Sequence, residues 1–374
     1  MTTDPLMARL RSCAGAAACW AFTILAVAPA ARPALRAQET ATAAKAAKAA
    51  KIDTVPRKLF RSQEPITVTI TVDLKKLVRM KDRQMAPLPA RMIYDAGAQG
   101  VDTMLISVGT RGNFRLKSCD FPPIRLYFSA PEVKHTVFEH QKDLKLVTRC
   151  KNNPEYEQYI LQEEPIYRIY NLFTPISLRT RLIKVTYADT LKKEPSITSW
   201  AFLVEDDKDM ARRNNGKMFV AKRAVFEDVE TPHLRIIGLL QYLIANTDWS
   251  LGALHNVKLM RAADNITVYP MAYDFDWSGV INPRYAFPDP QLPIRAVRDR
   301  LYRGPCMTKE EFVALAGEFT KRKDTIYALY DNQKDLSPAN IAQTKKYYDE
   351  FFKTIGNMRS AEGDILERCQ REGN

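Results

Sequence analysis

Several features that mark large classes of proteins are missing from this 374-residue sequence. It contains only four histidines, and its histidines and cysteines are not clustered as a zinc site requires. Lys and Arg are scattered and do not alternate with aromatic residues in one patch, which argues against nucleic-acid binding despite a net charge of +13. No internal repeat is visible. The hydrophobic content of 46% supports a sizeable globular core, and the basic balance suits anionic partners such as nucleotides or phospholipids.

The first residues predict export from the cytoplasm. Arg9 and Arg11 precede the small-residue and apolar run "AGAAACWAFTILAVAPAA", which ends in Ala-rich cleavage points. This order of parts is typical of a secretory signal peptide, here residues 1–37. An uncleaved N-terminal membrane anchor is the alternative, and no second stretch is long and apolar enough to span a bilayer. Residues 38–58 are rich in Ala and Lys, lack an apolar stripe and are interpreted as a linker.

Removal of the signal peptide would leave four cysteines, Cys119, Cys150, Cys306 and Cys369. An even number of cysteines in an oxidising compartment predicts two disulfides. Their order along the chain favours Cys119–Cys150 and Cys306–Cys369, although three pairings are possible. Four buried free thiols are the alternative if the protein is not exported.

The sequence changes near its middle from a pattern typical of strands to one typical of helices. Residues 59–205 contain short runs that alternate between β-branched and other residues, as in "PITVTITVDL", and one helical segment, "PEYEQYILQEEPIYRIYNLF". Residues 206–374 are predicted to be mainly helical. Helix starts are marked there by the capping box "TKEE" and by "SPAN", in which Pro follows a capping Ser. The pattern predicts an α+β protein whose β-rich part comes first.

Two polar clusters follow an apolar helix in the second half. "NTDWSLGALHN" supplies Asp248, His255 and Asn256, and "YDFDWSG" supplies Asp274 and Asp276. The intervening residues are predicted to form a β-hairpin, which would bring Asn256 and Asp274 close together. Carboxylate and amide oxygens are ligands suited to Mg²⁺ and to phosphate chemistry rather than to zinc.

The order of these residues resembles the CotH-type spore-coat protein kinase family and its secreted bacterial relatives. The resemblance covers roughly residues 111–279 and rests on "TRGNF", "LKLV", the helical segment above, "FLVEDD", "NTDW…HN" and "YDFDWSG". It implies an α+β, bilobal atypical protein-kinase-like fold with a β-rich N-terminal lobe and a helix-rich C-terminal lobe. The implied boundary between the lobes lies at residue 205.

The resemblance also implies a nucleotide site for ATP. Lys145 would hold the nucleotide phosphates and Glu163 would orient Lys145, while Glu205 would lie near the adenine at the lobe junction. No well-formed glycine-rich loop precedes Lys145, and "GTRGNF" stands in that place. Each residue also has a structural interpretation. In it, Lys145 faces solvent from a strand, Glu163 forms an ion pair within its helix, and Glu205 belongs to an acidic surface loop.

The remaining roles implied by the resemblance are catalysis and metal binding. Asp248 would be the catalytic residue that accepts the proton of the acceptor hydroxyl or positions the acceptor. Asn256 and Asp274 would hold Mg²⁺ or Mn²⁺, and Asp276 is a further ligand candidate because "DFD" replaces the "DFG" of kinases. The structural alternatives are turn hydrogen bonds at Asp248 and Asn256, and a solvated strand end at Asp274 and Asp276.

Three functions therefore stay open at the level of sequence. The first is an exported atypical kinase that transfers phosphate from ATP to a hydroxyl of a protein or small-molecule acceptor. The second is a secreted, catalytically inactive kinase-like binding or structural module. The third is a sugar-processing hydrolase that uses Asp248 with Asp274 or Asp276 as an acid/base pair.

Overall fold

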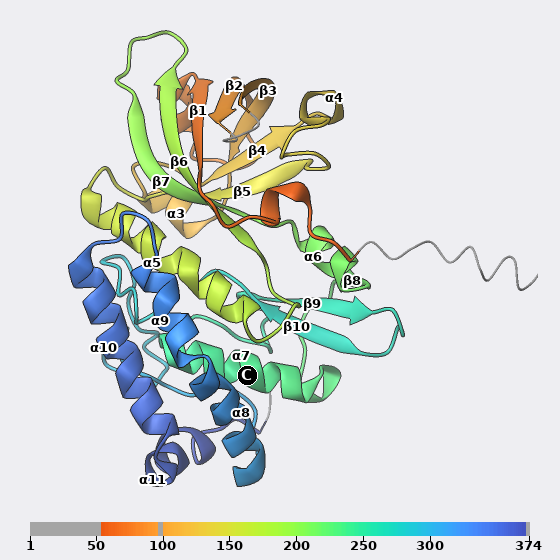
Figure 1. Cartoon of the computed structure of the whole chain (residues 1–374), viewed down its shortest axis with the longest axis vertical. Coiled ribbons are helices and arrows are strands. Elements are labelled where there is room, and N and C mark those ends of the chain that lie inside the picture. Colours follow the sequence, from red (N-terminus) through yellow and green to blue (C-terminus); the bar gives the residue numbers. More distant parts are fainter. Residues whose placement is uncertain (1–53, 96–99, 372–374) are drawn as a thin grey trace, which may run out of the picture. The chain divides into compact units, whose positions relative to one another are not determined.

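The computed structural model describes residues 54–95 and 100–371, and the compact unit to which they belong spans residues 52–374 (Figure 1). The predicted signal peptide, residues 1–37, and most of the predicted linker, residues 38–58, lie outside the described residues. Within the described part, no helix combines the length and the apolar character needed to cross a membrane.

Seven strands of the first half close into a barrel in the order β1-β2-β3-β4-β5-β7-β6. Their bounds are β1 Ile66–Val72, β2 Leu88–Asp95, β3 Val101–Thr110, β4 Ile124–Phe128, β5 Asp143–Val147, β6 Thr180–Asp189 and β7 Ile197–Val204. β1 pairs in parallel with β6, with Ile66 opposite Ile183, and this pairing closes the barrel. The other neighbours are antiparallel. Alternate residues of β1 are buried, as its alternating sequence predicts, and they contribute to a hydrophobic core inside the barrel.

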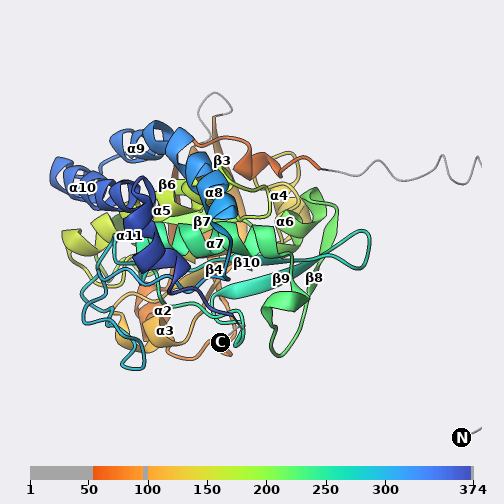
Figure 2. The ribbon, with the colours of Figure 1, turned by 90° about the horizontal axis from the view of Figure 1, so that it is seen from below.

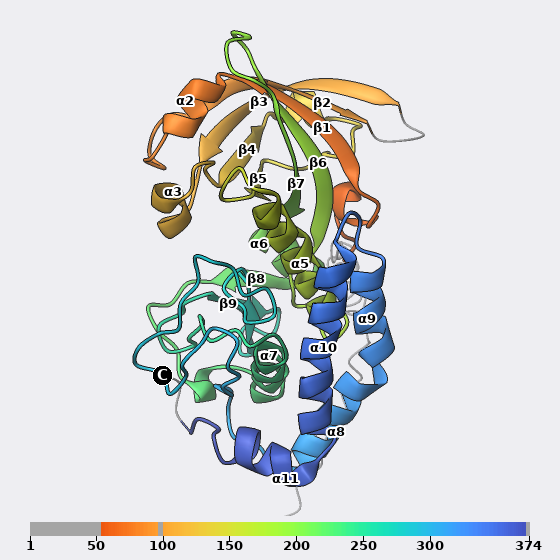
Figure 3. The ribbon, with the colours of Figure 1, turned by 90° about the vertical axis from the view of Figure 1, so that its left-hand side faces the viewer.

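Three short helices lie between the strands of the first half: α2 Leu74–Arg79, α3 Phe114–Ser118 and α4 Ala130–Val133. The long helix α5, Pro154–Asn171, begins with Asn153 as its N-cap and Pro154 in its first turn, and it continues through Pro165. α5 packs against β6 and β7 on one side and against α9, Lys323–Asp331, on the other (Figures 1 and 3). It therefore links the barrel to the helices of the second half.

The second half combines a small sheet with helices. β8 Gly216–Phe219, β9 Val257–Ala262 and β10 Val268–Ala272 form an antiparallel sheet in the order β10-β9-β8. The helices are α6 Asp207–Arg213, α7 Thr231–Ile244, α8 Lys309–Lys321, α9, α10 Pro338–Ile355 and α11 Met358–Ala361. Contacts of α10 with α7 and α9, and of α8 with α9, build a helical layer beside α7 (Figure 2). A second hydrophobic core joins this layer to α5 and the small sheet.

Several predictions from the sequence are confirmed. Thr308 and Glu311 form the predicted capping box of α8, and Ser337 caps α10 with Pro338 in the first turn. Both predicted disulfides, Cys119–Cys150 and Cys306–Cys369, are present. Structural disulfides are typical of proteins that fold in an oxidising compartment.

The predicted bilobal, kinase-like fold with separate lobes is wrong. The strands of the first half close into a seven-stranded barrel, and in the half predicted to be mainly helical β8 adds a third strand to the predicted hairpin of β9 and β10. The barrel and the helices belong to the same compact unit. The closure depends on pairing between β1 and β6, which are more than a hundred residues apart, and alternation within a strand does not encode such a partner.

Candidate functional site

A groove with a volume of about 440 Å³ brings together three segments that are distant in the sequence. The first follows β3 and carries "TRGNF", the second is the loop between α7 and β9, and the third follows β10. The side chains and backbone that line the groove come from Arg111, Gly112, Asn113, Phe114, Arg115, Pro123, Asp248, Leu254, His255, Asn256, Tyr273, Asp274, Asp276 and Trp277. Four of the residues predicted for catalysis and metal binding therefore share one groove.

Asp248 is fixed by the far end of its own loop. Backbone hydrogen bonds of 3.0 and 2.9 Å between Ser250 and His255 close this loop. The side-chain amide of Asn256 then donates to the backbone oxygen of Asp248 at 2.8 Å and to its carboxylate Oδ2 at 3.0 Å. His255 Nε2 lies 2.9 Å from the other carboxylate oxygen. The eight-residue interval between Asp248 and Asn256 is thus the length of a closed loop that holds the carboxylate in place.

The second polar segment is tied directly to the first. The backbone N–H of Tyr273 donates to the oxygen of Asn256 at 3.0 Å, and the N–H of Asp274 donates to the Tyr167 hydroxyl at 3.0 Å. Asn256 and Asp274 both adopt left-handed backbone, with φ of 52° and 64°. Such conformations are costly for residues other than glycine and concentrate at functional sites.

A glycine sets the course of the chain after these acids. The N–H of Gly279 donates to the oxygen of Ala245, at the end of α7, at 2.9 Å. A Cβ atom at position 279 would lie 2.5 Å from the backbone oxygen of Val297 and 2.9 Å from the Ala245 Cβ. Only glycine permits this approach, so Gly279 holds the "YDFDWSG" segment against α7.

Asp276 lines the groove and is buried. Its carboxylate accepts a hydrogen bond of 3.2 Å from the Tyr285 hydroxyl and lies 3.6 Å from Arg115 Nη1. Burial, followed by the negative charge of Asp274, raises the pKa of Asp276 to about 7. The neighbouring cation therefore compensates the carboxylate only in part.

Glu163 of α5 belongs to the same acidic cluster. Its side chain is buried, and burial together with Asp276 and Asp274 raises its pKa well above the usual value. Arg115 and Arg111 oppose that rise. We call Glu163, Asp274 and Asp276 the cleft acids.

Lys145 does not form its predicted ion pair with Glu163 among the described residues. Its ammonium lies 3.6 Å from Asp207 Oδ1 and 5.5 Å from the centre of the Tyr273 ring. Lys258 forms a second ion pair with Asp207 and lies 4.9 Å from the same ring. Burial lowers the pKa of Lys145 to about 8, and the charge of Asp207 opposes this shift.

Glu205, predicted to lie near the adenine, does not line the groove. Its carboxylate forms two hydrogen bonds of 2.9 Å with the guanidinium of Arg213 and accepts the backbone N–H of Arg179 at 3.0 Å. Both side chains of this ion pair are almost completely buried. These contacts bind Glu205 to Arg213 and Arg179, neither of which lines the groove.

The sequence interpretation missed the basic side chains of the groove. Arg111 belongs to "TRGNF", a segment considered for its glycine, and Arg115 follows it directly; both line the groove. Lys258 of β9 lies outside the groove lining but close to Tyr273, which lines it. Arg111 Nε donates to the Ile124 oxygen at 3.2 Å, and Arg115 donates to the oxygen of Thr148. The spacing of the arginines around Gly112 is a signal that could have identified them.

The donor set suits a hard divalent cation. Because the Asn256 amide nitrogen faces Asp248, its oxygen remains available as a ligand beside the carboxylate of Asp274. In the part of the chain that the structure describes, no group of three or more His, Cys, Asp or Glu side chains is placed so that it could hold a metal ion. Mg²⁺ that bridges phosphates needs only one or two protein carboxylates, so the residues present fit such an ion.

Comparisons with known proteins do not place the chain in a family. No family model matches it, and no curated protein matches it. One similar solved structure is that of CtkA, a proinflammatory kinase of Helicobacter pylori, with 11% sequence identity and a TM-score of 0.37. The match covers 64% of this chain and 91% of the CtkA chain. A match at this level does not establish a common fold, and the CotH-type family itself is not identified.

Proposed function

We propose that this protein is an exported phosphotransferase that moves the γ-phosphoryl group of ATP to a hydroxyl group, with Mg²⁺ or Mn²⁺ as its metal. The observation that carries this proposal is the charge pattern of the groove. The cleft acids lie beside Arg111 and Arg115, and Lys145 and Lys258 lie over the ring of Tyr273. A site that binds a metal–nucleotide complex needs both kinds of group, because it receives a cation and a polyanion together.

The metal, when bound to Asp274 and Asn256, would neutralise charge on the phosphate oxygens. Lys145 and Lys258 would bind the phosphates once these anions compete with Asp207 for the two ammonium groups. Arg111 and Arg115, which line the groove, are further phosphate-binding candidates. In this proposal Glu205 is structural, because Arg213 and the backbone of Arg179 occupy its carboxylate.

Asp248 lies at the rim, where an acceptor can approach. The oxygen of the acceptor hydroxyl would bond to the γ-phosphorus while its proton passes to the Asp248 carboxylate. The bond between the γ-phosphorus and the oxygen of the β-phosphate would break. His255 and Asn256 fix the carboxylate for this role. The products are ADP and a phosphorylated acceptor.

The contact between Lys145 and Asp207 favours one alternative, a secreted kinase-like binding module that does not turn over. In such a module Lys145 would stay paired with Asp207 and the groove would bind a nucleotide without transferring its phosphate. Transfer of label from γ-labelled ATP separates this alternative from the active enzyme.

Calorimetric titration of ATP with Mg²⁺ into two variants tests the proposal. Asp274→Asn should abolish metal-dependent nucleotide binding, because an amide cannot replace the charge that holds the dication. Asp248→Asn should still bind ATP with Mg²⁺, but phosphoryl transfer should fall by about 10²–10⁴-fold, the usual contribution of a general base.

Asp324→Asn is the matched control, since Asp324 is exposed in the first turn of α9, and it should behave as the parent protein. If the parent protein binds no nucleotide with any divalent metal, the proposed function is wrong. If Asp274→Asn binds ATP with Mg²⁺ as tightly as the parent, the metal assignment is wrong.

A further inference from the structure

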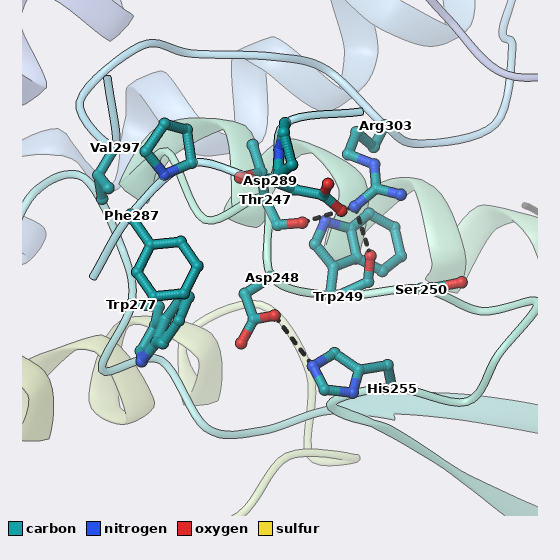
Figure 4. A pocket seen from close by; sticks show the side chains of 12 residues that line it. Thr247, Asp248, Trp249, Ser250, His255, Trp277, Phe287, Asp289, Val297 and Arg303 are labelled. Carbon is teal, nitrogen blue, oxygen red and sulfur yellow. Dashed lines mark hydrogen bonds and ion pairs between the residues drawn. The ribbon is translucent and has the colours of Figure 1, made fainter. Parts of the chain in front are cut away.

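A second cavity, with a volume of about 420 Å³, adjoins the groove at Asp248. The two hollows share Asp248, His255 and Trp277. Figure 4 shows the carboxylate of Asp248 between the rings of Trp277 and Phe287 on one side and His255 on the other. The volume falls in the usual range of small-molecule sites, about 300–1,000 Å³. We propose that this cavity is the acceptor subsite and that it binds a neutral carbohydrate; this inference rests on the proposed phosphotransferase function.

One wall of the cavity is aromatic. The ring centres of Trp277 and Phe287 lie 4.8 Å apart at an interplanar angle of 64°, and Phe287 is 57% exposed. On its other side Trp277 contacts Phe114, which lines the groove, at 5.6 Å. Large apolar side chains are seldom left exposed in a concave surface without a ligand to cover them. The wall therefore runs from the proposed nucleotide groove into the second cavity.

The polar groups of the cavity favour a hydroxyl-rich ligand over an anion. The guanidinium of Arg303 donates to the backbone oxygens of Thr247 and Trp249 at 2.5 and 2.7 Å, so it supports the loop that carries Asp248 (Figure 4). The carboxylates of Asp248 and Asp289 line the same space. Carboxylates accept hydrogen bonds from hydroxyl groups and repel phosphate or carboxylate ligands.

A sugar ring matches both features. Its C–H faces pack on aromatic rings, while its hydroxyl groups donate to carboxylates at the edge of the ring. A ring packed against Trp277 and Phe287 would place a hydroxyl beside Asp248. That hydroxyl oxygen would bond to the γ-phosphorus of ATP, the proton would pass to Asp248, and the bonding electrons of the broken P–O bond would leave with ADP.

The test uses three neutral oligosaccharides, maltotriose, cellotriose and N,N′,N″-triacetylchitotriose, with the full exported chain. Calorimetry first measures the binding of ATP with Mg²⁺, then the binding of each oligosaccharide to the protein saturated with ATP and Mg²⁺. Transfer of label from γ-labelled ATP is measured for each sugar and for a mixture of peptides that contain Ser, Thr and Tyr. We expect at least one sugar to bind and to accept phosphate.

Phe287→Ala should weaken binding of that sugar by about tenfold or more, as is usual for a central aromatic contact, with the affinity for ATP and Mg²⁺ unchanged. The control is Val313→Ala on α8, where an apolar side chain is similarly exposed, at 54%, and it should change neither affinity. The acceptor inference is overturned if ATP with Mg²⁺ binds but no sugar does, or if only the peptides accept phosphate. Failure of ATP and Mg²⁺ to bind would instead overturn the proposed function itself.

Discussion

Two groups of carboxylates in this protein have opposite surroundings. Glu205 is paired with Arg213 through two hydrogen bonds of 2.9 Å and also accepts a backbone N–H. The cleft acids lie close to one another, and their shared charge contributes to raised pKa values at Glu163 and Asp276. The negative charge of the Glu205 carboxylate is compensated by a cation and hydrogen bonds, whereas the cleft acids lie close to other negative charges.

The difference separates a structural role from a functional one. A buried charge is tolerated when a partner and hydrogen bonds replace the water that it loses. Carboxylates that repel one another inside a groove are tolerated when the site serves a cation that arrives later. The two groups of carboxylates therefore differ mainly in whether a nearby cation and hydrogen bonds compensate their negative charge.

The largest stability effect that the comparison predicts is at Arg213. Arg213→Ala leaves the carboxylate of Glu205 buried without its cation, and the free energy of unfolding should fall by about 3–5 kcal/mol. Urea denaturation followed by circular dichroism measures this loss.

Arg284→Ala provides the control, because Arg284 is 70% exposed in its ion pair with Glu155 and exposed pairs contribute about 0–1 kcal/mol. A loss at Arg213 as small as the loss at Arg284 would show that Glu205 is not a structural carboxylate, and the contrast would disappear.

Features of sequence that act over short distances were predicted well. Most strands of the first half, the caps of α8 and α10, and the hairpin between Asn256 and Asp274 follow from alternation, capping residues and turns. Closure of the barrel was not predicted, because it depends on the parallel pairing of β1 with β6 across more than a hundred residues. Local patterns name the strands but not their distant partners.

In the candidate site, too, the features that depend on neighbouring residues were predicted and those that depend on packing were not. Asp248, Asn256, Asp274 and Asp276 share one groove because their two loops are joined by a short hairpin. The contacts of Lys145, Glu163 and Glu205 depend on how the helices and strands pack together. Lys145 forms an ion pair with Asp207 rather than with Glu163, and Glu205 forms one with Arg213. The fold, and not the order of residues in the sequence, determines these pairs.

His233 gives a smaller effect and extends the comparison to a buried base. Burial lowers the pKa of His233 to about 4, whereas an unfolded histidine titrates near 6.5. Between these pH values the unfolded state binds more protons than the folded state. The contribution of His233 to the free energy of unfolding should therefore rise with pH across this window, by at most about 3 kcal/mol, whereas the raised pKa values of Asp276 and Glu163 contribute in the opposite direction.

Denaturation at a series of pH values isolates this contribution, because the free energy of unfolding of the parent relative to that of His233→Gln should rise between the folded-state and unfolded-state pKa values of His233. His135 is exposed, and His135→Gln should keep the slope of the parent. An unchanged slope in His233→Gln would contradict the assignment of this pH dependence to His233.

The smallest expected effect is also the one that bears most directly on the contrast between the two groups of acids. Asp276→Asn removes one of the cleft acids without changing the size of the side chain, and it relieves the repulsion with Asp274. In the absence of divalent metal at pH 8 this variant should be more stable than the parent by about 1 kcal/mol, as is common when a functional strain is removed. The matched change Glu205→Gln should act in the opposite direction, because it weakens a compensated ion pair. Thermal unfolding in the presence of a chelator measures both changes. If Asp276→Asn and Glu205→Gln both destabilise the protein, then the cleft acids are structural groups like Glu205, and the charge pattern no longer supports a cation site.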